Sequence, residues 1–353
     1  MEKITKLRNQ FDDLGIDGML ITNDQNRRYM TGFTGTAGIV LISKSEAKLI
    51  TDFRYVDQAK TQATDFDVIL HKNRTIDEID KQIASSNITK LGFEENHVTY
   101  NTFKTFSETI HAELVPTSKV IENLRLIKSK DEIETIKKAA HIADETFSHI
   151  IDYIHPGITE MDVNHELEAT MRKLGATSSA FDIIVASGSR SALPHGVASE
   201  KVIEKGDMVT LDFGAYYNGY RSDITRTVAV GKPDKELEKV YSIVREALSR
   251  GAEGLKPNMA ASAVDALPRD YITAKGFGSC FGHGAGHGIG LDIHEEPFFS
   301  KSSDKLTEPG MVVTIEPGIY IPELGGVRIE NDYLVTTDGN ETLSQSTTEL
   351  IVL

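Results

Sequence analysis

The 353-residue sequence has a single cysteine, Cys280, and no tryptophan. One thiol cannot form an intramolecular disulfide or a thiolate metal cluster, so both kinds of site are excluded. The sequence also lacks an apolar run of the roughly 18–20 residues that a membrane-spanning helix requires. Residues 1–8 are charged and carry no apolar core of a signal peptide. We therefore expect a cytoplasmic protein with no membrane partner.

Positive charge is in short supply. The chain has 38 Lys and Arg against 53 Asp and Glu, a formal net charge of −15. This balance argues against nucleic acid or an anionic membrane as the main partner. The apolar share of 39% is ordinary for a folded domain and too high for disorder. Some of the surplus carboxylates are candidates for holding cations.

Apolar spacing in the first third of the chain predicts an α/β domain. Ile4, Leu7, Phe11 and Leu14 recur at helical intervals, and Gly15 is a helix stop signal. Helical or turn segments separate several short, strand-like apolar runs. These runs are residues 18–22, 39–43, 47–51, 68–71 and 91–93. The alternation places the first domain at residues 1–122.

A second domain, residues 123–353, begins with a strong helix start. Ser129 and Glu132 have the spacing of a capping box and precede a long helical pattern. Amphipathic helices are also predicted at residues 160–174 and 236–251, between strand-like runs. The predicted fold class is therefore α/β (α+β), with two domains.

Histidines are distributed unevenly along the chain. The seven between residues 71 and 165 lie in settings typical of surface or satisfied core histidines. The other four, His195, His283, His287 and His294, lie among glycine and proline residues of the second domain. These four are the candidates for chemistry.

Glycine occupies every second position of residues 282–290. In an extended chain one face would carry only glycine, and the other would carry His283 and His287. A bare glycine face lets another backbone or a ligand approach closely. A dinucleotide loop does not fit, because its third glycine is missing, and Pro297 breaks an H-E-x-x-H zinc motif. A flexible glycine loop with incidental histidines remains an alternative.

Two aspartates flank a predicted hairpin. Asn218-Gly219 is a strong signal for a two-residue turn, and it places Asp212 opposite Thr225. Asp223 then lies on the same face as Asp212, about 7–8 Å away along the diagonal of the ladder. That separation suits one shared cation or a pair of cations. Two exposed strand acids are the alternative, although aspartate is depleted in buried strands.

Two further acids follow apolar strand-like runs. Glu316 ends one such run, and Glu330 shares a strand face with Arg328. Taken singly, each is better read as a surface strand acid. Four converging acids without cations would repel one another and raise one another's pKa. A pair of divalent ions with one neutral imidazole would balance them, and such oxygen-rich ligation suits Mn²⁺, Co²⁺, Fe²⁺ or Zn²⁺.

Five segments of the second domain together resemble the prolidase and aminopeptidase P family of "pita-bread" metallopeptidases. They are Leu-Asp-Phe-Gly at 211–214, Ser-Asp-Ile-Thr-Arg-Thr at 222–227, the glycine-rich run at 284–290, Ile-Glu-Pro-Gly-Ile-Tyr at 315–320 and Val-Arg-Ile-Glu at 327–330. Residues 29–35 and 51–55 resemble that family's N-terminal, creatinase-like domain. The resemblance covers nearly the whole chain.

The resemblance implies a role for each candidate residue. The implied metal ligands are Asp212, Asp223, His287, Glu316 and Glu330. His195 would position substrate and relay protons, and His294 would steady the tetrahedral intermediate. His283 would line the proline subsite, and Arg328 would orient the carboxylate ligands.

The implied activity is hydrolysis of Xaa-Pro bonds at the N-terminus of dipeptides or short peptides. A hydroxide bridging two divalent ions, Mn²⁺ foremost with Co²⁺, Zn²⁺ or Fe²⁺ as alternatives, would attack, with Glu316 accepting its proton. The resemblance further implies a homodimer, and we expect a loop near residues 26–33 to reach the partner's active site. Dipeptidase and longer-peptide aminopeptidase activity are not separable. A metal-free peptide-binding or scaffold protein on the same fold is the alternative, and a methionine aminopeptidase would lack the front domain.

Overall fold

The computed structural model describes all 353 residues, which form two compact units, Met1–Arg125 and Leu126–Leu353. The sequence placed the domain boundary near residue 122. The unit boundary falls later because helix α7 (Val120–Arg125) packs against α1 (Glu2–Arg8) and α3 (Asp24–Thr31) of the first unit. None of the helices combines the length and apolarity needed to cross a bilayer.

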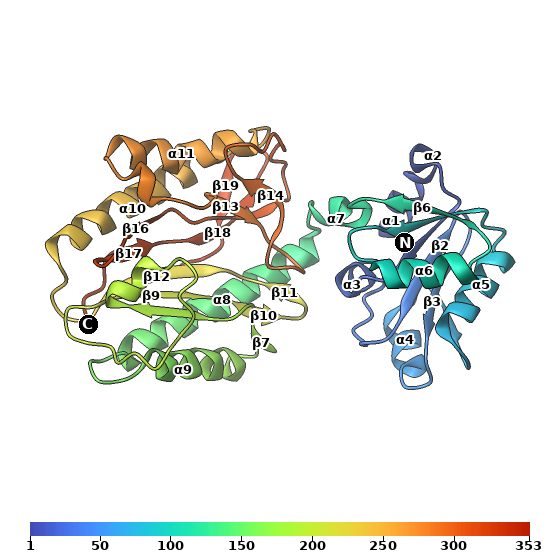
Figure 1. Ribbon diagram of the computed structural model, residues 1–353, viewed down its shortest axis with the longest axis horizontal. Helices are drawn as coiled ribbons and strands as arrows, with labels where there is room; N and C mark the ends of the chain where they lie inside the picture. Colours follow the sequence, from blue (N-terminus) through green and yellow to red (C-terminus); the bar gives the residue numbers. More distant parts are fainter. The chain divides into compact units, whose positions relative to one another are not determined.

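A six-stranded mixed sheet forms the centre of the first unit, in the order β4-β3-β2-β1-β5-β6 (Figure 1). Its strands are β1 (Gly18–Ile21), β2 (Ile39–Ser43), β3 (Ala47–Thr51), β4 (Asp67–Leu70), β5 (Lys90–Glu94) and β6 (Glu113–Thr117). Strand β1 runs antiparallel to β2 and parallel to β5. Helices α5 (Thr75–Ser85) and α6 (Tyr100–Thr109) bury Ile79 and Phe106 in a core shared with the sheet. The predicted α/β character of this domain is confirmed.

Residues 26–33 are not the loop that we expected. Residues up to Thr31 belong to α3, which Asn23 caps by accepting a hydrogen bond from the Asn26 backbone N–H at 2.9 Å. Tyr29 and Phe33 are buried. The expectation of a loop was wrong because Gly32 and Gly35 follow the helix and do not interrupt it, while contact of this segment with a partner's active site stays a prediction.

The second unit has one pair of helices on each side of its strands (Figure 1). The helices are α8 (Lys130–Tyr153), α9 (Glu160–Lys173), α10 (Lys235–Gly254) and α11 (Ala261–Ala274). α8 begins with the predicted capping box of Ser129 and Glu132. One apolar core joins α8 and α9 to strands within residues 184–229, and a second joins α10 and α11 to the later strands.

The strands of the second unit form several small sheets. The largest have the orders β12-β9-β8 and β14-β13-β15-β18-β19, and β16 pairs with β17. The bounds are β8 (Ile184–Ser187), β9 (Met208–Phe213), β12 (Ile224–Ala229), β13 (Gly286–Gly288), β14 (Glu295–Phe299), β15 (Val312–Ile315), β16 (Gly318–Ile321), β17 (Gly325–Arg328), β18 (Asn331–Val335) and β19 (Asn340–Thr342). The short strands β7 (Ser178–Ser179), β10 (Ala215–Tyr217) and β11 (Tyr220–Arg221) form a fourth sheet. This α+β arrangement matches the pita-bread fold that the resemblance implied.

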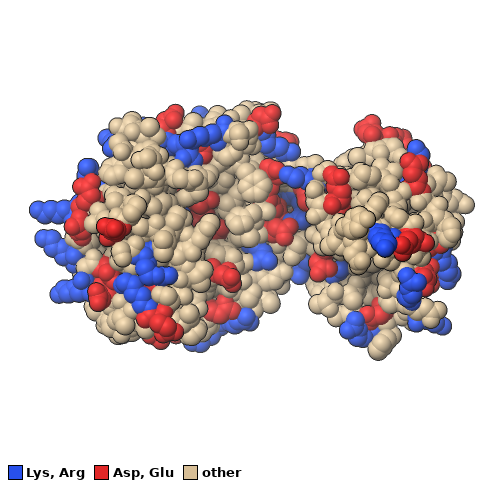
Figure 2. Space-filling view, in the orientation of Figure 1, with Lys and Arg blue, Asp and Glu red and all other residues tan.

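On the side in view, Lys and Arg lie among Asp and Glu over each unit (Figure 2). Despite the net charge of −15, the acidic residues on this side do not form a single acidic patch.

Candidate metal centre and active site

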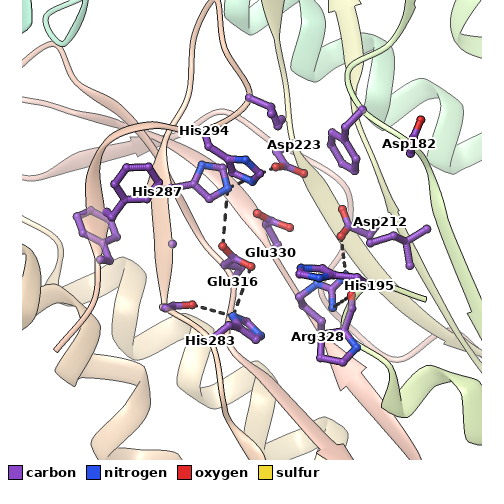
Figure 3. Close-up of a pocket in the computed structure, with 18 of the residues that line it drawn as sticks. Asp182, His195, Asp212, Asp223, His283, His287, His294, Glu316, Arg328 and Glu330 are labelled. Atoms are coloured by element: carbon purple, nitrogen blue, oxygen red, sulfur yellow. Dashed lines mark hydrogen bonds and ion pairs between the residues drawn. The ribbon is translucent and has the colours of Figure 1, made fainter. Parts of the chain in front are cut away.

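A pocket of about 550 Å³ opens in the second unit. It is lined by all nine residues singled out from the sequence: His195, Asp212, Asp223, His283, His287, His294, Glu316, Arg328 and Glu330. Their side chains surround one space although they come from widely separated segments (Figure 3). None of the seven histidines between residues 71 and 165 lines this pocket. The placement supports the nine as one site, while their individual roles stay predictions.

The hairpin register brings two of the acids together. β9 pairs with β12 so that Asp212 faces Thr225, which confirms the register predicted from Asn218-Gly219. The backbone N–H of Asp223 donates to Oδ2 of Asp332 at 3.0 Å, so Asp332 orients the start of β12. Both Asp212 and Asp223 are buried. The alternative of two exposed strand acids is therefore wrong.

The glycine-rich segment lets His287 enter the pocket. A Cβ on Gly286 would lie 2.1 Å from the carbonyl oxygen of Thr314, and one on Gly288 would lie 2.2 Å from that of Glu296. Only glycine allows neighbouring backbone this close, as the bare glycine face predicted. His287 projects from between them, and its backbone N–H donates to Oγ1 of Thr314 at 3.1 Å. The alternative of a flexible loop is wrong for this part of the segment, because β13 pairs with β14 and β15.

Three buried side chains meet closely enough to hold one cation. Candidate ligand atoms of Asp223, His287 and Glu330 all lie within 4.8 Å of one another. Nε2 of His287 is 3.7 Å from Oδ2 of Asp223 and 3.7 Å from Oε1 of Glu316. Nδ1 of His287 lies 2.9 Å from the carbonyl oxygen of Gly288. A carbonyl can only accept, so Nδ1 carries the proton and Nε2 presents a lone pair to the acids.

Several carboxylate oxygens of the site have no hydrogen-bond partner. Oδ1 of Asp212, Oδ1 of Asp223 and Oε1 of Glu330 are all buried and unsatisfied. Buried polar atoms of folded proteins are normally hydrogen-bonded, so such atoms need an explanation. Carboxylate oxygens with one imidazole nitrogen are donors that first-row divalent cations accept. The residues present therefore fit a divalent metal centre.

The acids of the site cannot all ionise without a counter-charge. Burial is the main cause that raises the pKa of Asp223 and of Glu316 well above the usual range, and the charge of Glu330 adds to both shifts. Burial, followed by repulsion from Asp212, raises the pKa of Glu330 to about 8. Burial lowers the pKa of His287 to about 4, which keeps its imidazole neutral. Neutral imidazole and deprotonated carboxylates are the forms that bind metal, so cations would favour ionisation of these acids.

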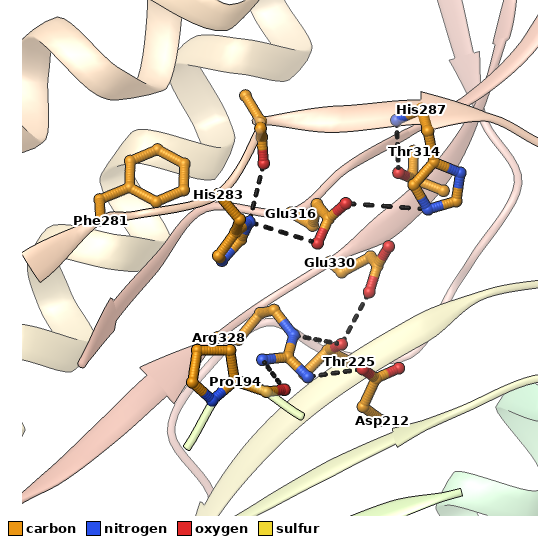
Figure 4. Close-up of polar contacts among 12 residues, drawn as sticks. Pro194, Asp212, Thr225, Phe281, His283, His287, Thr314, Glu316, Arg328 and Glu330 are labelled. Atoms are coloured by element: carbon orange, nitrogen blue, oxygen red, sulfur yellow. Dashed lines mark hydrogen bonds and ion pairs between the residues drawn. The ribbon is translucent and has the colours of Figure 1, made fainter. Parts of the chain in front are cut away.

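Arg328 connects the acids to the rest of the pocket (Figure 4). Its Nη2 donates to Oδ2 of Asp212 at 2.5 Å, and its Nε donates to Oγ1 of Thr225 at 3.1 Å. Thr225 in turn donates its hydroxyl to Oε2 of Glu330 at 2.7 Å. One guanidinium thus fixes Asp212 directly and Glu330 through a threonine, in line with the orienting role predicted for Arg328.

Tyr320 links Arg328 to His283. Nη1 of Arg328 donates to the Tyr320 hydroxyl at 2.8 Å, and that hydroxyl lies 2.8 Å from Nε2 of His283. Nδ1 of His283 lies 2.8 Å from the carbonyl oxygen of Gly284, so it carries the proton and Nε2 accepts from the tyrosine. Burial lowers the pKa of His283 to about 4 and raises that of Tyr320 to about 12. Both groups are therefore neutral near pH 7.

His294 and His195 are less enclosed. The ring of His294 stands at 78° to that of His287, with their centroids 4.5 Å apart. Burial lowers the pKa of His294, so it also favours the neutral form. His195 is exposed to solvent at the pocket wall, and its imidazole makes no hydrogen bond within the chain. Both imidazoles remain free to contact a substrate.

Sequence reasoning did not single out Tyr320, Thr225 or Asp332. Their contacts with His283, Glu330 and Asp223, respectively, each join remote segments, so no local spacing marked these contacts. Tyr320 did lie in one of the motifs that carried the family resemblance. That motif was the one signal that could have identified it.

Comparison with protein families gives two matches that together span most of the chain. Residues 134–337 match the metallopeptidase family M24, and residues 3–127 match the creatinase/prolidase N-terminal domain.

Similar proteins match over the full length. A solved structure of an Xaa-Pro dipeptidase from Bacillus anthracis is 59% identical, covers 100% of this chain and 99% of its own, and superposes with a TM-score of 0.99. An Xaa-Pro dipeptidase from Pyrococcus furiosus is 41% identical over 99% of each chain. The structure of an X-Pro aminopeptidase from Thermotoga maritima is 39% identical, with a TM-score of 0.92 over 98% of this chain and 100% of its own.

Proposed function

The chain belongs to metallopeptidase family M24 and carries a creatinase/prolidase N-terminal domain, and from this premise we propose that it hydrolyses Xaa-Pro bonds at the N-terminus of dipeptides or short peptides. The observation that carries the proposal is the convergence of the five ligand-type side chains, with buried carboxylate oxygens that have no hydrogen-bond partner. The five are Asp212, Asp223, His287, Glu316 and Glu330. Relatives named Xaa-Pro dipeptidase supply the substrate class.

These five residues would hold a pair of divalent cations, with Mn²⁺ as the first candidate and Co²⁺, Zn²⁺ or Fe²⁺ as alternatives. Bound cations would polarise the scissile carbonyl and supply hydroxide near neutral pH. Glu316, whose Oε1 faces His287 and whose Oε2 faces His283, is placed to accept a proton and pass it to the leaving nitrogen. His294 would donate a hydrogen bond to the developing oxyanion.

The pocket also suits a proline-containing substrate. An Xaa-Pro bond is a tertiary amide without an N–H, so recognition must use its carbonyl oxygen and the shape of its ring. His283 and His195 line one part of the pocket beside Arg328, where a proline ring and its carboxylate would lie. Phe181, Ile184 and other apolar side chains line the wall as well. They would pack against the residue that precedes proline.

The direct test compares an Xaa-Pro dipeptide and an Xaa-Pro-Yaa tripeptide as substrates with added Mn²⁺. We expect hydrolysis of at least one, and the ratio of the two kcat/KM values separates a dipeptidase from a longer-peptide aminopeptidase. Asp223→Ala and Glu330→Ala should each abolish this activity. Glu253→Gln, an exposed acid of the same unit, is the control and should keep it. Retained hydrolysis in both ligand variants would exclude the proposal.

Metal analysis distinguishes this proposal from a metal-free peptide-binding or scaffold protein. We expect about two divalent ions per chain after Mn²⁺ loading and removal of free metal. A chain that binds no ion and cleaves neither peptide would be the metal-free alternative. Light scattering in solution would test the proposed homodimer separately.

A further inference from the structure

The loop that carries His195 begins after β8, with the 3-10 turn Gly188–Ala192 (η1), and reaches Ser199. The His195 side chain is exposed and makes no hydrogen bond or ion pair with the chain. Its position is therefore set by the backbone that bears it. What holds this loop decides where the imidazole stands in the pocket.

Both ends of the loop are bound to one buried carboxylate. Glu160, the first residue of α9, has a fully buried side chain. Its Oε1 accepts from the backbone N–H of Ser187 at 2.7 Å and from the Ser187 hydroxyl at 2.9 Å. Its Oε2 accepts from the backbone N–H of Ser199 at 3.1 Å and from the Ser199 hydroxyl at 2.7 Å. Ser187 and Ser199, at the two ends of the loop, thus donate to the same carboxylate.

Arg190 adds a contact within the loop. Its Nη1 donates to Oε2 of Glu160, and its Nη2 donates to the carbonyl oxygen of Val197 at 2.9 Å. Val197 lies two residues beyond His195, and its backbone N–H donates to the His195 carbonyl oxygen at 2.9 Å. The carboxylate of Glu160 is therefore connected to the backbone immediately after His195.

The middle of the same loop touches the strand that carries Arg328. The carbonyl oxygen of Pro194 accepts from Nη1 of Arg328 at 3.2 Å. The hydroxyl of Ser191 accepts from the backbone N–H of Gly326 at 2.8 Å. The loop is thus held at its ends by Glu160 and at its middle by β17.

We propose that Glu160 is a positioning residue that acts on catalysis through His195, by closing the loop on which that histidine stands. Glu160 does not line the pocket, so it does not contact substrate. A buried carboxylate is costly unless donors surround it, and here the donors come from the loop itself. The inference rests on the proposed function, because it assigns a support to one of the residues proposed to act on substrate.

The test is a double-mutant cycle with Glu160→Gln and His195→Asn, measured as kcat/KM for an Xaa-Pro dipeptide with Mn²⁺. The amide keeps the size of the side chain but replaces one acceptor oxygen with a donor that faces other donors. We expect Glu160→Gln alone to lower kcat/KM by about 10-fold to 100-fold, as for other residues that orient a catalytic group. In the His195→Asn background, Glu160→Gln should lower kcat/KM by less than about 3-fold, because the imidazole that it positions is gone. The loss should also divide between kcat and KM as it does in His195→Asn.

Two further variants keep the test decisive. Asp162→Asn is the matched control, because Asp162 lies in the same first turn of α9 but bonds only to Thr159. Ser199→Ala removes one hydroxyl donor and serves if Glu160→Gln does not fold. Equal losses in both histidine backgrounds, full activity of His195→Asn, or an equal loss in Asp162→Asn would each overturn the inference. A wild-type protein that cleaves no Xaa-Pro bond would instead refute the proposed function.

Discussion

Glu330→Gln should stabilise the metal-free protein, although it removes a proposed metal ligand. Oε2 of Glu330 accepts the Thr225 hydroxyl, and a glutamine oxygen can keep that bond. Oε1 is buried without a partner, in a pocket that Asp212 and Asp223 also line. An amide NH₂ at this place would remove a negative charge beside Asp212 and Asp223 and would offer them a hydrogen-bond donor instead.

The expected gain follows from the pKa of Glu330, which burial and the charge of Asp212 raise from 4.5 to about 8. Between these two values the folded state keeps a proton that the unfolded state has lost, so stability falls as pH rises. At about 1.4 kcal/mol per pKa unit, ionisation of Glu330 lowers the free energy of unfolding of the wild-type protein at pH 8 by at most about 4 kcal/mol. Water that enters the metal-free pocket screens part of the repulsion, so we expect a gain of about 2 kcal/mol. For a unit of this size, that gain corresponds to a rise in Tm of about 4–8 °C.

Differential scanning calorimetry in a chelator at pH 8 measures this rise, with Glu253→Gln as the control in which Tm should not change. At pH 5 the gain should be smaller, because wild-type Glu330 is then protonated in the folded state. With Mn²⁺ the order should reverse, since the variant binds metal less well. A variant that melts at or below the wild-type temperature in chelator at pH 8 would refute the reasoning.

Three other substitutions test the supports of the site. Arg328→Lys should lower kcat/KM by about 10-fold to 100-fold, because an ammonium cannot make the hydrogen bonds that the guanidinium makes to both Asp212 and Thr225. Titration calorimetry should also show weaker Mn²⁺ binding. Tyr320→Phe should reduce kcat/KM by about 10-fold or more while far-UV circular dichroism is unchanged, since only the hydroxyl that bridges Arg328 and His283 is lost; unaltered kinetics would contradict this. Lys128→Met should lower the free energy of unfolding in urea by about 3–5 kcal/mol, because it removes the buried ammonium that lies 3.0 Å from Oε2 of Glu295, and Lys128→Met with Glu295→Gln should recover part of the loss.

Local patterns in the sequence predicted much of the structure. The turn residues Asn218-Gly219 fixed a register in which Asp212 faces Thr225, and the ladder of β9 and β12 follows it. The spacing of Ser129 and Glu132 marked the start of α8, and both halves of that capping box form. Gly15 ends the N-terminal helical segment with φ 65°, although that segment is divided into α1 and α2 (Phe11–Leu14). These features depend on neighbours within a few residues, which is why one sequence suffices to predict them.

What the sequence by itself determined is therefore the fold class, the family and the set of ligand-type residues, because motif order and short-range geometry carry that information. Only the tertiary structure decided what supports those residues. The bonds from Arg328 to Asp212 and from Thr225 to Glu330, and the hydrogen bonds of Glu160 to the loop of His195, join segments far apart in the chain. Their partners are chosen by packing and by the need to satisfy buried polar groups, and no periodicity along the chain encodes that choice.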